Sequence, residues 1–173
     1  LVRDLLLWHK ERNALSLCAP LGHLLAGAIA ALLEVKMPDD ATKVLLTPVP
    51  SRRSVVRERG HDPVRRITLR AASILRGSGW PVSMNPILRQ RFAVRDQSEL
   101  DRAGRGMNLK DSIAIDGGLR QALSLAGRPV TFVLCDDILT TGATASECQR
   151  ALEDSGLQVR GIATIAHTVK RHC

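Results

Sequence analysis

The segment FVLCDDILTTGATASE, residues 132–147, decides the fold. An apolar run ends in two adjacent carboxylates, Asp136 and Asp137, and small and hydroxyl-bearing residues follow at once. A short apolar run bounded by turn signals is typical of a buried strand. Thr144, with Glu147 three residues later, predicts a capping box at the start of a helix. The segment therefore predicts a strand, a tight turn and a helix.

The turn has the composition of an anion-binding site. In parallel α/β sheets, ligands bind beyond the carboxyl ends of the strands, and the N-terminus of the following helix attracts anions. Small side chains let backbone N–H groups approach a phosphate, threonine hydroxyls add donors, and a glycine permits unusual backbone angles. The expected phosphate-binding residues are Thr140, Thr141, Gly142, Ala143 and Thr144.

The two carboxylates call for a different partner, because an ionised carboxylate repels phosphate. Asp136 and Asp137 can accept hydrogen bonds from two vicinal hydroxyls, or hold Mg²⁺ through water. A phosphate and a diol close together describe a ribose 5-phosphate. The alternative is an ordinary strand-to-helix turn, but such a turn needs one capping acid and no threonine pair. The segment has neither the G-K-[ST] of a Walker A loop nor the G-x-G-x-x-G of a dinucleotide fingerprint.

The rest of the chain alternates between strand and helix signals. Strands are expected at 43–50, 81–88, 129–136 and 158–169, and helices at 1–9, 20–35, 63–77 and from 144. Asp62 followed by Pro63 is a helix start, and apolar residues at 119, 122, 123 and 126 mark a further helix. Residues 51–60 are expected to be a basic connector, and the polar segment 89–112 a lid or arm with a helical turn near 98–105. This alternation predicts an α/β fold with a central, mainly parallel sheet flanked by helices.

Size and composition narrow the class of protein. The chain has 173 residues, which suits one domain, and a net charge of +8, which suits polyanions or a solvated basic surface. Aromatic residues make up 2%, so a single-stranded nucleic-acid binder built on stacking is disfavoured. The four cysteines form no C-x-x-C pair, which indicates a reducing cytoplasm. No apolar run approaches the roughly 20 residues of a membrane span, so none is expected.

The segment 132–147 resembles the phosphoribosyl pyrophosphate (PRPP) signature of type I phosphoribosyltransferases: an apolar strand, two acids, two small apolar residues, then T-T-G-x-T. Two further segments resemble the ComF/GntX family, named for competence (DNA uptake). TPVPSRRSVVRERGHDPVRRI resembles its P-V-P and R-G-F-N-Q segment. LRQRFAVRDQSELDRAGRGMNLKDSIAI matches its polar region at Gln97, Leu100, Arg105 and Asn108. The resemblance covers most of residues 44–166.

The resemblance implies a type I phosphoribosyltransferase fold with a flexible lid loop over residues 89–108. Residues 1–36 would be a helical segment packed on the core, and 37–173 the phosphoribosyltransferase-like domain, within one structural domain. It implies transfer of the phosphoribosyl group from PRPP, with Mg²⁺, to a nitrogenous acceptor, releasing pyrophosphate. Asp136 and Asp137 would be catalytic. Backbone amides near residues 50–53 would face the pyrophosphate. The candidate cations, each also explicable as a solvated loop residue, are Arg52, Arg53, Arg89, Arg91 and Arg105.

The chain departs from the family pattern at several places. His61, Asp62 and Pro63 replace F-N-Q, and Ile115 stands where phenylalanine is usual. The four-cysteine zinc module of many members is not seen; it is expected to be lost or to lie upstream. Thr140 stands where hypoxanthine–guanine enzymes carry an acid, which disfavours that substrate class.

Two other functions stay open. One is a PRPP sensor without catalysis. The other is an interaction protein for DNA uptake or repair that meets nucleic acid or a helicase. The acceptor base and the oligomeric state, including a homodimer, are left open by the residues.

Overall fold

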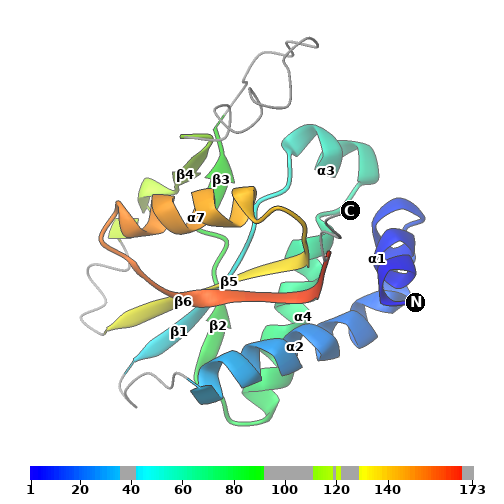
Figure 1. Ribbon diagram of the computed structural model, residues 1–173, viewed down its shortest axis with the longest axis horizontal. Helices are drawn as coiled ribbons and strands as arrows, with labels where there is room; N and C mark the ends of the chain where they lie inside the picture. Colours follow the sequence, from blue (N-terminus) through cyan, green and yellow to red (C-terminus); the bar gives the residue numbers. More distant parts are fainter. Residues whose placement is uncertain (36–41, 92–110, 119, 122–128, 169–173) are drawn as a thin grey trace, which may run out of the picture.

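The centre of the molecule is a four-stranded parallel sheet with the strand order β2-β1-β5-β6 (Figure 1). Its strands are β1 (Lys43–Pro48), β2 (Val82–Met84), β5 (Val130–Leu139) and β6 (Gln158–His167). The structure is a computed structural model that describes residues 1–35, 42–91, 111–118, 120–121 and 129–168. The expected α/β fold with a central parallel sheet is therefore confirmed.

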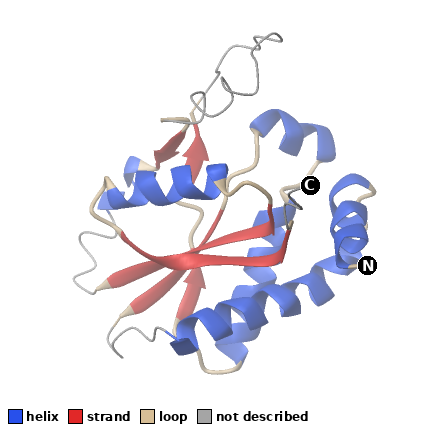
Figure 2. Cartoon of the chain, in the orientation of Figure 1, coloured by secondary structure: helices blue, strands red, loops and turns tan. Residues whose placement is uncertain are grey.

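Helices cover both faces of this sheet (Figure 2). Helices α2 (Cys18–Val35) and α4 (Pro63–Gly77) pack against each other and against the sheet, while α7 (Ala143–Glu153) lies on the opposite face. The shorter helices α1 (Val2–Glu11) and α3 (Arg53–Arg59) lie near the carboxyl ends of the strands (Figure 1), and a 3-10 turn, Leu15–Leu17, joins α1 to α2.

The alternation of side chains along the strands divides the core into two layers. Val44 and Leu46 of β1 pack with Val133 of β5 toward α2 and α4. The intervening Leu45 and Phe132 pack toward α7. Cys135 and Cys148 are fully buried core residues, one in each layer.

The predicted start of α4 is confirmed. The Asp62 carboxylate caps the helix by accepting a hydrogen bond from the Arg65 backbone N–H at 3.1 Å, and Pro63 is the first helical residue. Proline suits this position because its missing N–H would have no partner inside the helix.

Three expectations about secondary structure were wrong. The stretch 81–88 is divided at Asn85 and Pro86, so β2 joins the parallel sheet while β3 (Leu88–Gln90) pairs antiparallel with an unforeseen strand β4 (Ile113–Ile115). The basic connector contains α3, which ends at Arg59 with Gly60 as its C-cap. Strand β5 continues past residue 136 to Leu139 because it keeps pairing with β6 up to His167.

The prediction of a capping box formed by Thr144 and Glu147 was also wrong. Helix α7 begins at Ala143, and its N-cap is Gly142, which forms no side-chain capping bond. Thr144 therefore lies inside the first turn, and Glu147 binds Arg150 instead. The turn at 98–105 and most of the helix expected around 119–126 lie outside the described residues.

One segment departs from the expectation that no apolar run is long enough to span a membrane. Leu15–Val35, with 21 residues and a mean hydropathy of 1.8, is long and apolar enough to cross a membrane by length and composition. In the structure the stripe formed by Leu21, Leu25, Ile29 and Leu33 is buried in the core, which is also how the central helix of a folded domain behaves.

Candidate functional site

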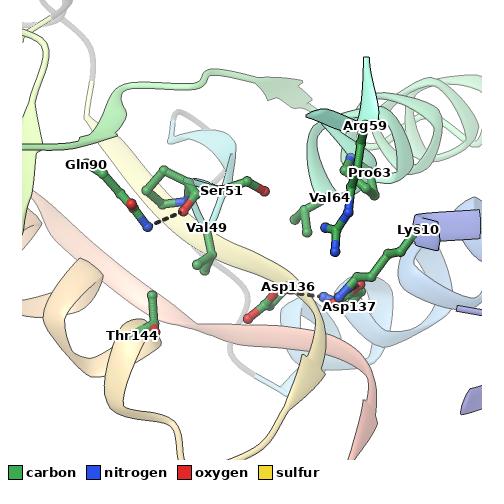
Figure 3. Close-up of a pocket in the computed structure, with 11 residues that line it drawn as sticks. Lys10, Val49, Ser51, Arg59, Pro63, Val64, Gln90, Asp136, Asp137 and Thr144 are labelled. Carbon is green, nitrogen blue, oxygen red and sulfur yellow. Dashed lines mark hydrogen bonds and ion pairs between the residues drawn. The ribbon is translucent and has the colours of Figure 1, made fainter. Parts of the chain in front are cut away.

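Asp136 and Asp137 line a cavity of about 210 Å³ near the carboxyl ends of β1 and β5 (Figure 3). Seven parts of the chain contribute to it: α1, the loop after β1, α3, α4, β3, β5 and α7. Its lining residues are Lys10, Val49, Pro50, Ser51, Arg59, Pro63, Val64, Gln90, Asp136, Asp137 and Thr144.

The length of β5 brings the carboxylates to this cavity. Pairing of β1 with β5 stops at Pro48 and Cys135, so Asp136 and Asp137 lie just past the end of β1. The Asp137 backbone N–H donates to Oδ1 of Asp136 at 2.9 Å, and the Ile138 N–H donates to Oδ1 of Asp137 at 2.8 Å. These bonds fix one oxygen of each carboxylate and leave the other for further partners.

The two carboxylates differ in their surroundings. Asp137 is only 3% exposed, and its Oδ2 forms an ion pair with Nζ of Lys10. Burial and the neighbouring Asp137 raise the pKa of Asp136 to about 7, although the Asp137 backbone N–H and Lys10 act in the opposite direction. The site therefore holds the ion pair of Lys10 and Asp137 beside Asp136, a carboxyl group whose pKa is raised to near neutrality.

The turn after β5 contains a glycine in the left-handed region. Gly142 adopts a left-handed conformation, with φ +76°, which is costly for residues with a Cβ. The Ala143 N–H donates to Oγ1 of Thr141 at 3.3 Å, and Thr140 and Thr141 are exposed. Of the five residues expected to bind phosphate, Thr144 lines the cavity itself, and the other four form the adjoining turn and the first residue of α7.

The structure places the candidate arginines elsewhere. Arg53 and Arg89 line a neighbouring cavity of about 330 Å³, which shares Pro50, Ser51 and Gln90 with the site. Arg52 and Arg91 are exposed and line neither cavity. Arg105 lies outside the described residues, with most of the expected lid.

Sequence reasoning missed two cations that do line the site, Lys10 of α1 and Arg59 of α3. Arg59 forms an ion pair with Glu11, the neighbour of Lys10 in sequence. No local motif marks Lys10, because only the packing of α1 near the strand ends brings it to the cavity. Arg59 is the arginine of the R-G pair in the segment compared with R-G-F-N-Q, and that signal could have identified it. The Gln90 amide donates to the Pro50 carbonyl at 3.1 Å and so links β3 to the loop after β1.

Two buried histidines support this end of α1. The rings of His9 and His61 meet edge to face, with their centroids 5.6 Å apart. Nδ1 of His9 donates to the Ala14 carbonyl at 3.2 Å, and Nδ1 of His61 donates to the Arg59 carbonyl at 3.1 Å. Burial lowers the pKa of His9, so its ring is neutral at neutral pH. His61, which departs from the family pattern, thus packs against α1 and does not line the cavity.

The side chains around Asp136 and Asp137 limit how a metal ion could bind at this site. Among the residues described, no group of three or more histidine, cysteine or acidic side chains could hold a metal ion. Asp137 already faces Lys10, which leaves Asp136 as the second carboxylate. Two carboxylates, one of them paired with a lysine, could reach a hydrated Mg²⁺ only through water, which is a common arrangement for this ion.

Comparison with models of known protein families gives no match, and neither does comparison with curated proteins.

Proposed function

We propose that this chain binds PRPP in the cavity at the ends of β1 and β5, within a type I phosphoribosyltransferase fold of the ComF/GntX kind. Asp136 and Asp137 would accept hydrogen bonds from the two ribose hydroxyls. The turn from Thr140 to Thr144 would bind the 5-phosphate. The proposed activity is transfer of the phosphoribosyl group to a nitrogenous acceptor.

One observation carries the proposal: paired carboxylates and a hydroxyl-rich helix N-terminus meet at one cavity. Asp136, Asp137 and Thr144 all line it, and they come from one strand and the helix that follows. Carboxylates accept hydrogen bonds from a diol, while the N–H groups at the start of α7 favour an anion. A single ligand that satisfies both needs hydroxyls and a phosphate a few atoms apart.

The same arrangement suits the transfer step. A nitrogen of the acceptor forms a bond to C1 as the bond from C1 to the pyrophosphate oxygen breaks, and positive charge develops on the sugar ring. Asp136 and Asp137, held under the ring through its hydroxyls, would stabilise that charge in a partly buried environment. Bound Mg²⁺ would neutralise charge on the departing pyrophosphate.

Isothermal titration calorimetry with PRPP and Mg²⁺ tests the proposal. We expect wild-type protein to bind PRPP and ribose 5-phosphate, and the double variant Asp136→Asn, Asp137→Asn to bind neither while it still unfolds cooperatively. Asp154→Asn is the matched control, because this carboxylate is 63% exposed and lies at the far end of α7. Unchanged binding by the double variant would rule out this site.

A second measurement separates a transferase from a sensor. Wild-type protein with PRPP, Mg²⁺ and a panel of purine, pyrimidine and smaller nitrogenous acceptors should release pyrophosphate with at least one of them. Binding of PRPP without release for any acceptor would favour a sensor on the same site.

A further inference from the structure

Two cations from the N-terminal half of the chain lie on the wall of the site cavity next to Asp137. Lys10 is 23% exposed along its side chain and reaches across from the last turn of α1 to Asp137. Arg59, at the end of α3, is 26% exposed. Figure 3 shows both side chains directed toward the aspartates, with Thr144 on the far side of Asp136.

Thr144 lies on one side of the two aspartates, and the two cations lie on the other side (Figure 3). This order matches the order of phosphate, hydroxyls and pyrophosphate along PRPP. With the 5-phosphate at the turn beside Thr144 and the 2- and 3-hydroxyls at the carboxylates, C1 is the sugar carbon farthest along from the phosphate. Its substituent would therefore point past Asp137, toward Lys10 and Arg59. In PRPP that substituent is the pyrophosphate.

We propose that Lys10 and Arg59 bind the pyrophosphate of PRPP, and that Lys10 bridges it to Asp137. The inference rests on the proposed function. It adds Lys10, which no sequence motif contains, and it gives a role to Arg59, which stands in the segment compared with R-G-F-N-Q. An ammonium has three donors, so Lys10 can keep its contact with Asp137 and still donate to a phosphate oxygen. Arg59 is paired with Glu11, whose side chain is 53% exposed, so this carboxylate has water available when the guanidinium turns to a ligand.

Two other arrangements make different predictions. Lys10 could act only on the fold, by tying α1 to Asp137; the effect of its loss would then not depend on whether the ligand carries pyrophosphate. Alternatively, the pyrophosphate could lie in the neighbouring cavity, which four arginines line: Arg53, Arg57, Arg65 and Arg89. Loss of Arg89 would then weaken PRPP binding, and loss of Lys10 would not.

The test compares three ligands, PRPP, ribose 5-phosphate and inorganic pyrophosphate, each with Mg²⁺, by calorimetry on the full chain. The variants are Lys10→Met, Arg59→Met, Arg89→Met and Lys43→Met. Lys43 is the matched lysine control, because it is exposed and begins β1 at the opposite end of the sheet. Thermal unfolding of every variant monitors the fold, and Arg59→Met carries the test if Lys10→Met does not fold.

We expect Lys10→Met and Arg59→Met each to weaken PRPP by about tenfold or more, the loss expected for one charge-assisted hydrogen bond, while ribose 5-phosphate changes by less than about threefold. Lys10→Arg should recover much of the PRPP affinity, and Lys43→Met should match wild type. Equal losses for PRPP and ribose 5-phosphate would overturn the inference in favour of a structural role. A loss confined to Arg89→Met would overturn it in favour of the neighbouring cavity.

Titration with pyrophosphate distinguishes a failure of this inference from a failure of the proposed function. If wild type binds neither PRPP nor ribose 5-phosphate, the proposed function fails. Pyrophosphate binding that is lost in Lys10→Met would still support the two cations as an anion site. If wild type binds none of the three ligands, both proposals fail.

Discussion

Gly22 of α2 lies directly against the side chain of Arg70 of α4. A Cβ added at Gly22 would be 2.8 Å from Cβ of Arg70 and closer still to its Cγ. These atoms belong to the base of the arginine side chain, which cannot move away without a shift of the helix. The absence of a side chain at Gly22 therefore sets how closely the two helices that cover one face of the sheet approach each other.

Gly22→Ala should therefore destabilise the protein. We expect a loss of about 1–3 kcal/mol in the free energy of unfolding, since overpacking forces the backbone to move. Gly27→Ala in the same helix is the control. It has no neighbouring atom within 4 Å, and alanine is about 0.5–1 kcal/mol better than glycine inside a helix, so this variant should be more stable than wild type. Urea denaturation measures both; equal effects would contradict the close contact.

The central strands and α4 could be predicted from sequence because their signals are local. Residues 43–48 and 130–135 are compact apolar runs, and Asp62 with Pro63 marks a helix start in two adjacent residues. The prediction failed where several local preferences competed. Thr144 with Glu147 has the pattern of a capping box, but the left-handed turn at Gly142 starts α7 one residue earlier, and Arg150 takes the glutamate.

The candidate site was found only in part, for a similar reason. Asp136, Asp137 and Thr144 lie in one continuous motif, so their spacing alone brings them together. Lys10 reaches the cavity only because α1 packs near the strand ends, and no spacing in the sequence encodes that contact. Arg59 stands in the segment compared with R-G-F-N-Q, but nothing in that segment distinguished it from the neighbouring arginines. Many arginines of this chain are expected to lie in loops. Their charge and loop position therefore could not indicate which arginines line the site.

Arg150→Met should destabilise the protein by leaving a buried carboxylate without its partner. Glu147 is 6% exposed and accepts hydrogen bonds from Nε of Arg150 at 2.8 Å and from Nη2 at 2.7 Å. We expect a lower free energy of unfolding at pH 7, with the loss limited by the backbone hydrogen bonds that Glu147 keeps with Asp111 and Ile113. Adding Glu147→Gln should recover part of it, since the unpaired charge is then removed.

The same pair gives a pH dependence with a definite sign. Hydrogen bonds from Arg150 lower the pKa of Glu147, so the stability it contributes is present above the usual glutamate pKa and is lost as the pH falls through the lowered value. Chemical denaturation of wild type and Arg150→Met at pH 7 and pH 3.5 should show a smaller difference at the lower pH. A difference that does not shrink would exclude the pair as its source.

Burial of His9 should make the protein sensitive to mild acid. Because burial lowers the pKa of His9, its contribution to stability is present above the usual histidine pKa and is lost as the pH falls below it. His9→Phe keeps a ring in the same place and removes the titration. Its unfolding midpoint should therefore fall less between pH 7.5 and pH 5.5 than that of wild type. His23→Phe, at an exposed position of α2, should follow wild type.

Asp136 should produce a dependence of the opposite sign. Its raised pKa, about 7, means that its stabilising effect is complete below the usual aspartate pKa and is lost as the pH rises through 7. Asp136→Asn removes the charge with little change of shape, and each unit of pKa shift corresponds to about 1.4 kcal/mol.

We therefore expect Asp136→Asn to be more stable than wild type at pH 8, by about 1–3 kcal/mol, with a much smaller gain at pH 5. Comparing the two proteins at the same pH cancels the contribution of His9. Asp154→Asn, at an exposed site, should show no such change with pH. Equal gains at both values would mean that Asp136 ionises like an exposed aspartate. The explanation of its raised pKa by burial and Asp137, opposed by Lys10, would then be incorrect.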